Sequence, residues 1–286
     1  MTDTLIVGPG FVGGLVAEKL LNRGDKVWVL KRSERDVPQG ATPIFGNIAD
    51  EAICAEIPKS IETIYYAVSP SSSELDSYRE AYVDGIRALL NHLSRSTNQT
   101  RRLIVTSSTG VYHQKDGSWV DESSPTRPER KSAAQILVGE ELLKEAALET
   151  ISYRLSGIYG PGRNRLIRMV AAGQATYVEG QPHFTNRIHR EDCALSLIHL
   201  MEIEKPEPIY IGVDHDTAKR VEVLGWIAEQ IGAPQPKGIQ AEAASPRLRF
   251  ANKRCKNDLL VASGYPFRFP SYRDGYEAML KTWKAG

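Results

Sequence analysis

The sequence contains few cysteines and no long apolar run. Its 286 residues include 3 cysteines, Cys54, Cys193 and Cys255, which are too few and too scattered for a disulfide framework or a cysteine-based zinc site. No apolar run approaches the ~20 residues that a membrane-spanning helix requires. Residues 1–10 also lack the charged and apolar regions of a signal peptide. We therefore expect a cytoplasmic protein with reduced thiols, no metal site and no membrane partner.

An excess of charge of either sign is also missing. Lys and Arg together number 36 and Asp and Glu number 35, which gives a formal net charge of +1. Proteins that gather nucleic acid usually carry a strong positive field. The balance therefore predicts no nucleic-acid partner, and any anion must bind at a local site. The chain is long enough for roughly two domains, at about 150 residues each.

Short β-branched runs alternate with longer segments of helical periodicity along the chain. This alternation is typical of βαβ units and predicts an α/β fold with a parallel sheet. The expected strands are 4–7, 26–30, 42–45, 63–68, 102–107, 151–155 and 208–211. The expected helices carry apolar stripes within 12–20, 75–93, 136–148 and 193–200.

The regular alternation of strand-like and helix-like segments ends after residue 160. Glycine and proline punctuate the stretch that follows, at Pro161, Gly162, Gly173, Gly180 and Pro182. Such punctuation is typical of loops that cover the ligand edge of a sheet. We predict a first domain at 1–160 and a smaller lobe at 161–286. The boundary is expected to be interleaved, because the helix near 190–203 has the apolar stripe of one that packs on the first domain's sheet.

The strongest local signal is the turn Gly8-Pro9-Gly10-Phe11-Val12-Gly13, between the first strand and the first helix. The pattern G-x-G-x-x-G in this place is the fingerprint of a Rossmann domain that binds a dinucleotide. Gly8 permits the tight turn, Gly10 lets the backbone approach a pyrophosphate, and Gly13 lets the helix pack on the strand. Phe11 and Val12 open the helix, whose N–H groups then face the phosphates. The sequence predicts a doubly wound Rossmann sheet, and a glycine-rich turn without a ligand is the alternative.

The end of the second strand distinguishes between dinucleotides. NAD-specific sites place Asp or Glu there, ~20 residues after the glycines, to bind the ribose 2′-hydroxyl. This chain has Lys31, Arg32 and Ser33 instead. Arg32 is able to bind a 2′-phosphate bidentately, so the segment favours NADP over NAD. A solvated surface turn has the same composition.

Several further segments follow one another in the order of a known family. They are TSSTGVY at 106–112, VDESSP at 120–125, YRLSGIYGPG at 153–162 and IHRED at 188–192. With them the chain resembles the extended short-chain dehydrogenase/reductases, the NAD-dependent epimerase/dehydratase family. The resemblance implies a Rossmann domain that binds NAD(P) and a small C-terminal substrate lobe. It also implies a small-molecule substrate, hydroxylated, keto or nucleotide-linked.

Two departures from the family pattern affect the expected chemistry. Extended members usually carry G-x-x-G-x-x-G, whereas Val7 stands in the first glycine's place here, which indicates an atypical branch. The family's chemistry rests on Tyr-x-x-x-Lys, in which the lysine lowers the tyrosine pKa so that the phenolate exchanges a proton with the substrate. Ser132 and Ile136 stand at these two positions, so the usual proton relay cannot operate.

The resemblance leaves two hypotheses. The first is an NAD(P)-dependent oxidoreductase or isomerase with an unorthodox active site. In it Ser108 stands where the family places the hydroxyl that contacts the substrate, and Tyr112 is our first candidate for the proton donor. The remaining candidates are His113, Lys131, Tyr159 and His189. The second hypothesis is a non-catalytic NADP(H) sensor or scaffold. Ser108 also suits a strand end that only satisfies turn backbone.

The resemblance further implies contacts for the rest of the cofactor. Asn47 and Ile48 follow the third strand, where family members place a turn beside the adenine. Ala67, Val68 and Ser69 end the fourth strand, on the edge where open α/β sheets bind ligands, and are expected to line the cofactor's ribose. The helices at 75–93 and 136–148 resemble those through which family members form a homodimer.

Overall fold

The computed structural model describes residues 2–95, 97–180, 182–244 and 252–283. The lobe expected at 161–286 therefore includes positions 181, 245–251 and 284–286, which lie outside the described residues. The chain divides into two compact units, each of which is described by itself. Unit 1 comprises Met1–Val111, Thr126–Arg154 and Cys193–Tyr210, and unit 2 comprises Tyr112–Pro125, Leu155–Asp192 and Ile211–Gly286.

The central element is a seven-stranded sheet with strand order β11-β7-β5-β4-β1-β2-β3. Its strands are β1 (Asp3–Val7), β2 (Lys26–Lys31), β3 (Thr42–Phe45), β4 (Thr63–Tyr66), β5 (Arg102–Ser108), β7 (Glu149–Leu155) and β11 (Ile209–Gly212). The pairs from β3 to β5 are parallel, and the strand order reverses between β1 and β4. This is a doubly wound Rossmann sheet, as predicted, and ligands bind at such a reversal point.

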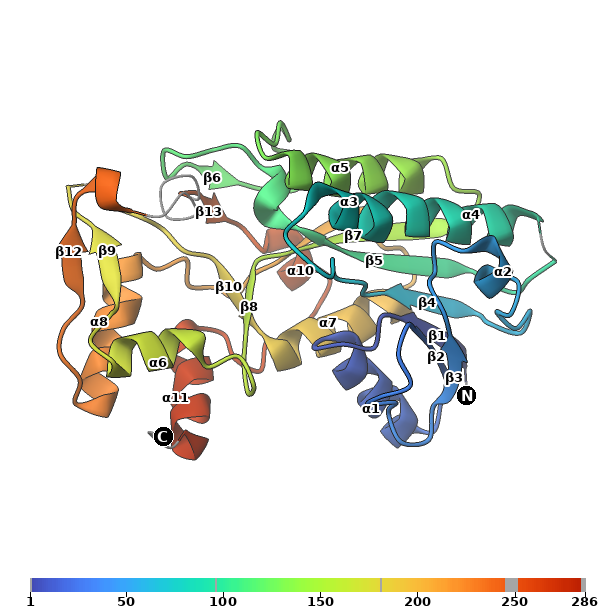
Figure 1. The fold of residues 1–286 in the computed structure, drawn as a ribbon, viewed down its shortest axis with the longest axis horizontal. Coiled ribbons are helices and arrows are strands. Elements are labelled where there is room, and N and C mark those ends of the chain that lie inside the picture. The colour runs from blue at the N-terminus through green and yellow to red at the C-terminus, as the bar shows by residue number, and fades with distance from the viewer. Residues whose placement is uncertain (1, 96, 181, 245–251, 284–286) are drawn as a thin grey trace. The chain divides into compact units, whose positions relative to one another are not determined.

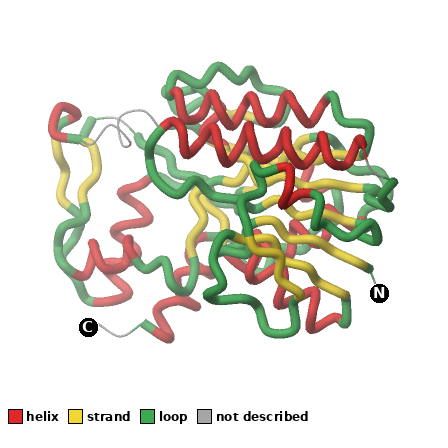
Figure 2. The backbone as a smooth tube through the Cα atoms, turned by 45° about the vertical axis from the view of Figure 1, so that its right-hand side comes forward, coloured by secondary structure: helices red, strands yellow, loops and turns green. Residues whose placement is uncertain are grey.

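Helices cover both faces of this sheet in unit 1 (Figures 1 and 2). Together α3 (Leu75–Arg79), α4 (Gly85–Arg95) and α5 (Lys131–Lys144) cover one face, and α1 (Gly13–Arg23) and α7 (Arg190–Glu202) cover the other. The short helix α2 (Glu51–Cys54) follows β3. β1 is buried on both faces, as expected for an inner parallel strand, since Leu5, Ile6 and Val7 are at most 1% exposed. Its Leu5 and Val7 share a core cluster with Leu89 of α4.

Several predicted boundaries were wrong by a few residues. The helix expected within 136–148 begins earlier, at Lys131, and ends earlier, at Lys144. The strand expected at 63–68 ends at Tyr66, and Ala67 leaves the sheet to pack against the turn at Gly8. The helix expected within 75–93 is present and extends to Arg95, with a π turn, η1 (Glu80–Asp84), between α3 and α4.

Unit 2 has a smaller core of its own. Its helices are α6 (Arg165–Ala171), α8 (Arg220–Ile231), α10 (Asp258–Ala262) and α11 (Tyr272–Thr282). Its parallel strand pairs are β8 (Gly157–Tyr159) with β10 (Arg187–His189), β9 (Thr176–Val178) with β12 (Lys237–Ile239), and β6 (Trp119–Val120) with β13 (Arg254–Cys255). Residues 112–125 and 155–160, which the sequence placed in the first domain, group with this unit, whereas 193–202 of α7 group with unit 1.

Candidate functional site

The glycine-rich turn joins β1, β4 and α1 tightly. Gly8 has φ +83°, and a Cβ there would lie 2.9 Å from the backbone of Ala67. A Cβ on Gly13 would lie 2.5 Å from the carbonyl oxygen of Gly8. Gly10 differs, because a Cβ there would have no described atom within 4 Å. Gly8 and Gly13 therefore allow the close packing of the turn, and Gly10 leaves its outer side open.

A cavity of about 550 Å³ lies beside this turn, entirely within unit 1. It is lined by the carboxyl ends of β1, β2, β3 and β4, the edge at which open α/β sheets bind ligands. The expected cofactor residues that line it are Gly8, Gly10, Lys31, Arg32, Ser33, Asn47, Ile48, Ala67, Val68 and Ser69. Phe11, Val12 and Gly13 are not among its lining residues, since the chain turns there into α1 and Val12 is buried.

The cavity also contains residues that sequence reasoning missed. Arg35 and Asp36 come from the turn after β2, and Ser71, Ser77 and Glu80 come from the segment after β4. Arg35 could have been found from the sequence, because it belongs to the basic segment that starts at Lys31. Nothing in the helical periodicity of 75–93 distinguished Glu80 from the residues around it.

Polar contacts link the charged residues of the cavity wall. The Lys31 ammonium donates to the carbonyl oxygens of Arg35 and, at 3.1 Å, Asp36. Arg32 Nη1 lies 3.8 Å from a carboxylate oxygen of Glu80. The other oxygen of Glu80 accepts a hydrogen bond of 2.6 Å from Asn47 Nδ2. Residues from the ends of β2 and β3 are thereby connected to the helix segment after β4.

The two candidate catalytic residues have different surroundings. Ser108 is the last residue of β5, and its half-buried hydroxyl accepts a hydrogen bond from the Gly110 N–H at 3.0 Å. Tyr112 belongs to unit 2 and is 3% exposed. Lys253, which sequence reasoning missed, donates from Nζ to the Tyr112 carbonyl oxygen at 3.4 Å. Lys253 is 7% exposed, and its burial lowers the pKa of the ammonium.

A buried ion pair fixes the strand that carries Ser108. Arg154 of β7 and Glu140 of α5 have side chains only 4% and 3% exposed, with Nη2 and Oε2 2.6 Å apart. Arg154 Nε also donates to Oε1 at 3.0 Å. Ser107 of β5 donates its hydroxyl proton to the same carboxylate. The pair therefore holds α5, β5 and β7 together one residue before Ser108.

The motif segments YRLSGIYGPG and IHRED meet as neighbouring strands in unit 2. Tyr159 of β8 pairs with His189 of β10, and their rings lie 5.3 Å apart. Burial raises the pKa of Tyr159 and lowers that of His189, so both side chains are neutral near pH 7. Asp192 accepts from Tyr265 Oη at 2.7 Å and from two backbone N–H groups, which makes it a structural anchor.

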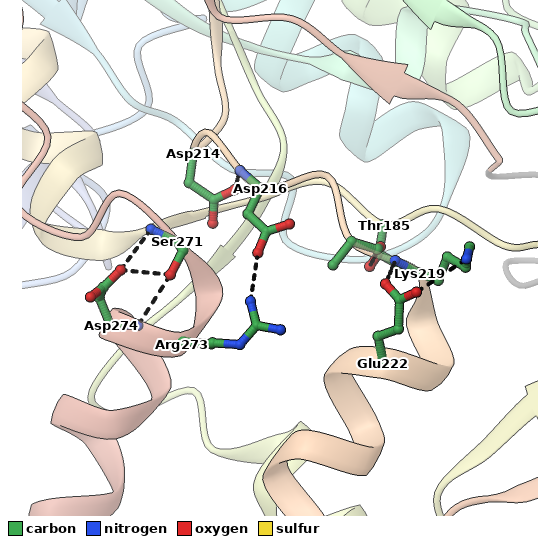
Figure 3. Close-up of polar contacts among 9 residues, drawn as sticks. Thr185, Asp214, Asp216, Lys219, Glu222, Ser271, Arg273 and Asp274 are labelled. Atoms are coloured by element: carbon green, nitrogen blue, oxygen red, sulfur yellow. Dashed lines mark hydrogen bonds and ion pairs between the residues drawn. The ribbon is translucent and has the colours of Figure 1, made fainter.

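A polar loop follows β11 in the same unit (Figure 3). Asp214 is 2% exposed, and this burial raises the pKa of its carboxyl well above the ordinary value. One of its oxygens accepts from the Asp216 N–H at 3.1 Å, and Asp216 in turn accepts from Arg273 at 3.2 Å. Ser271 and Asp274 cap the start of α11. These contacts stabilise the loop against α11.

The described residues contain neither a candidate metal site nor a candidate membrane-spanning helix. Within 2–95, 97–180, 182–244 and 252–283, no three His, Cys, Asp or Glu side chains are grouped so that they could hold a metal ion. In the same part of the chain no helix has the length and apolar character needed to cross a membrane.

Comparison with known proteins assigns the chain to a family. The model of the NAD dependent epimerase/dehydratase family matches residues 4–202. The chain belongs to this family. The match covers the glycine turn, Ser108, Tyr112 and the motif segments that carried the resemblance, which is thereby confirmed.

Individual relatives of this epimerase/dehydratase family member match different shares of its chain. A solved structure of a putative NAD-dependent epimerase/dehydratase from Methylobacillus flagellatus is 31% identical, covers 98% of both chains and has a TM-score of 0.81. The Thermus thermophilus UDP-glucose 4-epimerase in complex with NAD is 20% identical over 96% of both chains, with a TM-score of 0.79. The UDP-glucose 4-epimerase of Streptomyces lividans is 28% identical over 57% of this chain. The matches span only part of the curated relatives' own length: 53% of this Streptomyces lividans epimerase, and 26% of a sterol-4-alpha-carboxylate 3-dehydrogenase from Dictyostelium discoideum.

The two positions of α5 that the resemblance assigns to the Tyr-x-x-x-Lys pair hold Ser132 and Ile136. Ser132 is half-buried in its first turn, and Ile136 packs into the core at 5% exposure. Lys131, one of the remaining candidates for proton exchange, is exposed at the start of the same helix.

Proposed function

We propose that the chain binds NAD(P), with a preference for NADP, and acts as an oxidoreductase or isomerase on a small hydroxylated or nucleotide-linked substrate. The observation that carries the proposal is the cavity at the carboxyl edge of the sheet, onto which Gly10 opens. Its volume of about 550 Å³ suits a small-molecule or cofactor site. Solved structures with the same fold hold NAD, as in the Thermus thermophilus epimerase, which supports a dinucleotide.

The proposed pose follows from the lining residues. The pyrophosphate lies at the turn of Gly8 and Gly10, where backbone N–H groups and the start of α1 favour an anion. Asn47 and Ile48 border the adenine, and the ends of β2 and β4 border the riboses. Three cations line this cavity, Lys31, Arg32 and Arg35, against the carboxylates of Asp36 and Glu80. This local positive charge favours the 2′-phosphate of NADP.

The chemistry proposed is hydride exchange, which a bound nicotinamide supplies. Ser108 is the proposed contact of the substrate oxygen, and Tyr112 is the proposed proton donor. The missing Tyr-x-x-x-Lys pair favours a second candidate function, a non-catalytic dinucleotide sensor.

The three free cysteines are buried, which supports a cytoplasmic location. The proposed homodimer forms through the helices at 75–93 and 136–148, on which Leu75 and Val138 are exposed.

Removal of the guanidinium at the end of β2 tests the cofactor preference. Arg32→Ser is expected to weaken NADP binding about tenfold and to change NAD binding by less than about threefold, because a charge-assisted pair contributes ~1.5–3 kcal/mol. The measurement is a fluorescence titration with each reduced dinucleotide. Arg95→Ser is the matched control, since this arginine is exposed on α4 and pairs with Glu51. An equal loss for both dinucleotides contradicts the preference.

Turnover distinguishes the enzyme from the sensor. Incubation with NADPH and a panel of keto sugars and small ketones is expected to show oxidation of the dinucleotide. Ser108→Ala and Tyr112→Phe are each expected to reduce this rate by about 100-fold, the lower end of the contribution of a positioned proton donor. Absence of oxidation across the panel, in a protein that still binds NADPH, favours the sensor.

A further inference from the structure

The long helix after β4 is widened at a fixed place. The π turn η1 begins at Glu80, and the hydroxyl of buried Tyr66 donates to the carbonyl oxygen of Ala81 at 2.5 Å. A Cβ on Gly85 would collide with this Tyr66 hydroxyl, and a Cβ on Gly139 of α5 would collide with the carbonyl oxygen of Tyr82. Contacts from both β4 and α5 therefore hold the π turn, a feature that is frequent at functional sites.

Glu80, the first residue of the π turn, brings a carboxylate to the cofactor cavity. Glu80 lines the cavity, accepts from Asn47 Nδ2 at 2.6 Å and lies 3.8 Å from Arg32 Nη1. Asn47 is itself oriented by accepting from the Ala49 N–H at 3.2 Å. Glu80 thus stands between the end of β2, where an adenosine ribose is expected, and the end of β3, where the adenine is expected.

The position of the Glu80 carboxylate bears on whether the cavity favours NAD or NADP. Lys31, Arg32 and Ser33 at the end of β2 include no carboxylate for a ribose diol. Two carboxylates line the cavity, Asp36 from the turn after β2 and Glu80 from the helix after β4, and of these Glu80 is the one in contact with Arg32 and Asn47. A carboxylate accepts hydrogen bonds from hydroxyl groups and repels a phosphate. Glu80 also lies 3.8 Å from Arg32, the side chain that a 2′-phosphate needs, and so competes with such a phosphate for the guanidinium.

We propose that Glu80 is a specificity-determining residue of the dinucleotide site. It accepts a hydrogen bond from the adenosine ribose of NAD and opposes the 2′-phosphate of NADP. It thereby limits the NADP preference that Lys31, Arg32 and Arg35 create, and the protein retains binding of NAD. This inference rests on the proposed function, since it assumes that the cavity holds a dinucleotide.

Glu80→Gln tests this role because it removes the charge and keeps an oxygen able to accept from Asn47. The dissociation constants of NAD and NADP are measured by titration for wild type and variant at low and high salt. We expect NADP to bind about tenfold more tightly and NAD about threefold more weakly, as charge repulsion and a charge-assisted hydrogen bond are lost. The gain for NADP is expected to shrink with salt.

Two further variants make the result specific. Asp84→Asn removes a carboxylate of the same π turn that pairs with Arg79 and Arg87 and does not line the cavity, so it is expected to leave both affinities unchanged. Glu80→Asp keeps the charge and is expected to keep the wild-type ratio within about threefold.

The outcomes separate this proposal from the proposed function. An unchanged NADP-to-NAD ratio in Glu80→Gln overturns the specificity role, and so does an equal weakening of both dinucleotides, which indicates a purely structural contact with Asn47. A wild-type protein that binds neither dinucleotide overturns the proposed function itself, and this inference with it. The melting temperatures of all variants establish that each is folded.

Discussion

Gly10→Ala is expected to weaken NADPH binding about 100-fold while the protein remains folded. The added methyl group would stand on the open side of the turn, where the backbone must approach the pyrophosphate. Loss of one or two charge-assisted hydrogen bonds, ~1.5–3 kcal/mol each, accounts for this magnitude. Gly10 has no positive φ and no described neighbour within 4 Å of such a Cβ, so alanine causes no strain. The measurement is the nicotinamide fluorescence on titration with NADPH.

A matched control lies four residues along the chain. A Cβ on Gly14 would contact the Pro9 carbonyl oxygen at 3.3 Å, and Gly14 does not line the cavity. Gly14→Ala is therefore expected to change the affinity by less than about threefold. Equal affinities in wild type and Gly10→Ala would contradict the proposed position of the pyrophosphate.

Arg154→Met is expected to lower the free energy of unfolding by about 3–5 kcal/mol, because Glu140 is left as a buried charge without its partner. For a chain of this size that corresponds to a melting temperature lower by roughly 6–20 °C. Glu140 and Arg154 are both almost fully buried and are joined by more than one hydrogen bond. Thermal denaturation followed by circular dichroism measures the change.

The double variant Arg154→Met/Glu140→Leu provides the control for this pair. Apolar replacement of both partners of a buried ion pair is often neutral, so most of the lost stability is expected to return. Lys144→Met, which removes an exposed lysine paired with Glu141 on the same helix, is expected to change the melting temperature by about 2 °C or less. A single variant as stable as wild type would show that the buried pair contributes little.

The sequence by itself determined the features that depend on residues close together in the chain. The apolar run at 4–7, the glycines at 8, 10 and 13 and the stripe that follows predict one βα unit, which the structure contains as β1 and α1. Local backbone geometry contributes to such a unit, because Gly8 has φ +83° and Gly13 packs against the carbonyl oxygen of Gly8. The order of the motif segments along the chain also predicted the family, and the match of the family model over residues 4–202 confirms this prediction.

Only the tertiary structure decided which distant residues meet. Glu80 lines the cavity and contacts Asn47 and Arg32, which are 33 and 48 positions away in the chain. Lys253 lies against Tyr112, 141 residues away, through the fold of unit 2. Periodicity indicates which face of a helix or strand is buried, whereas contacts between distant elements depend on how those elements pack. The contacts of Glu80 and Lys253 could therefore not be predicted from a local sequence pattern.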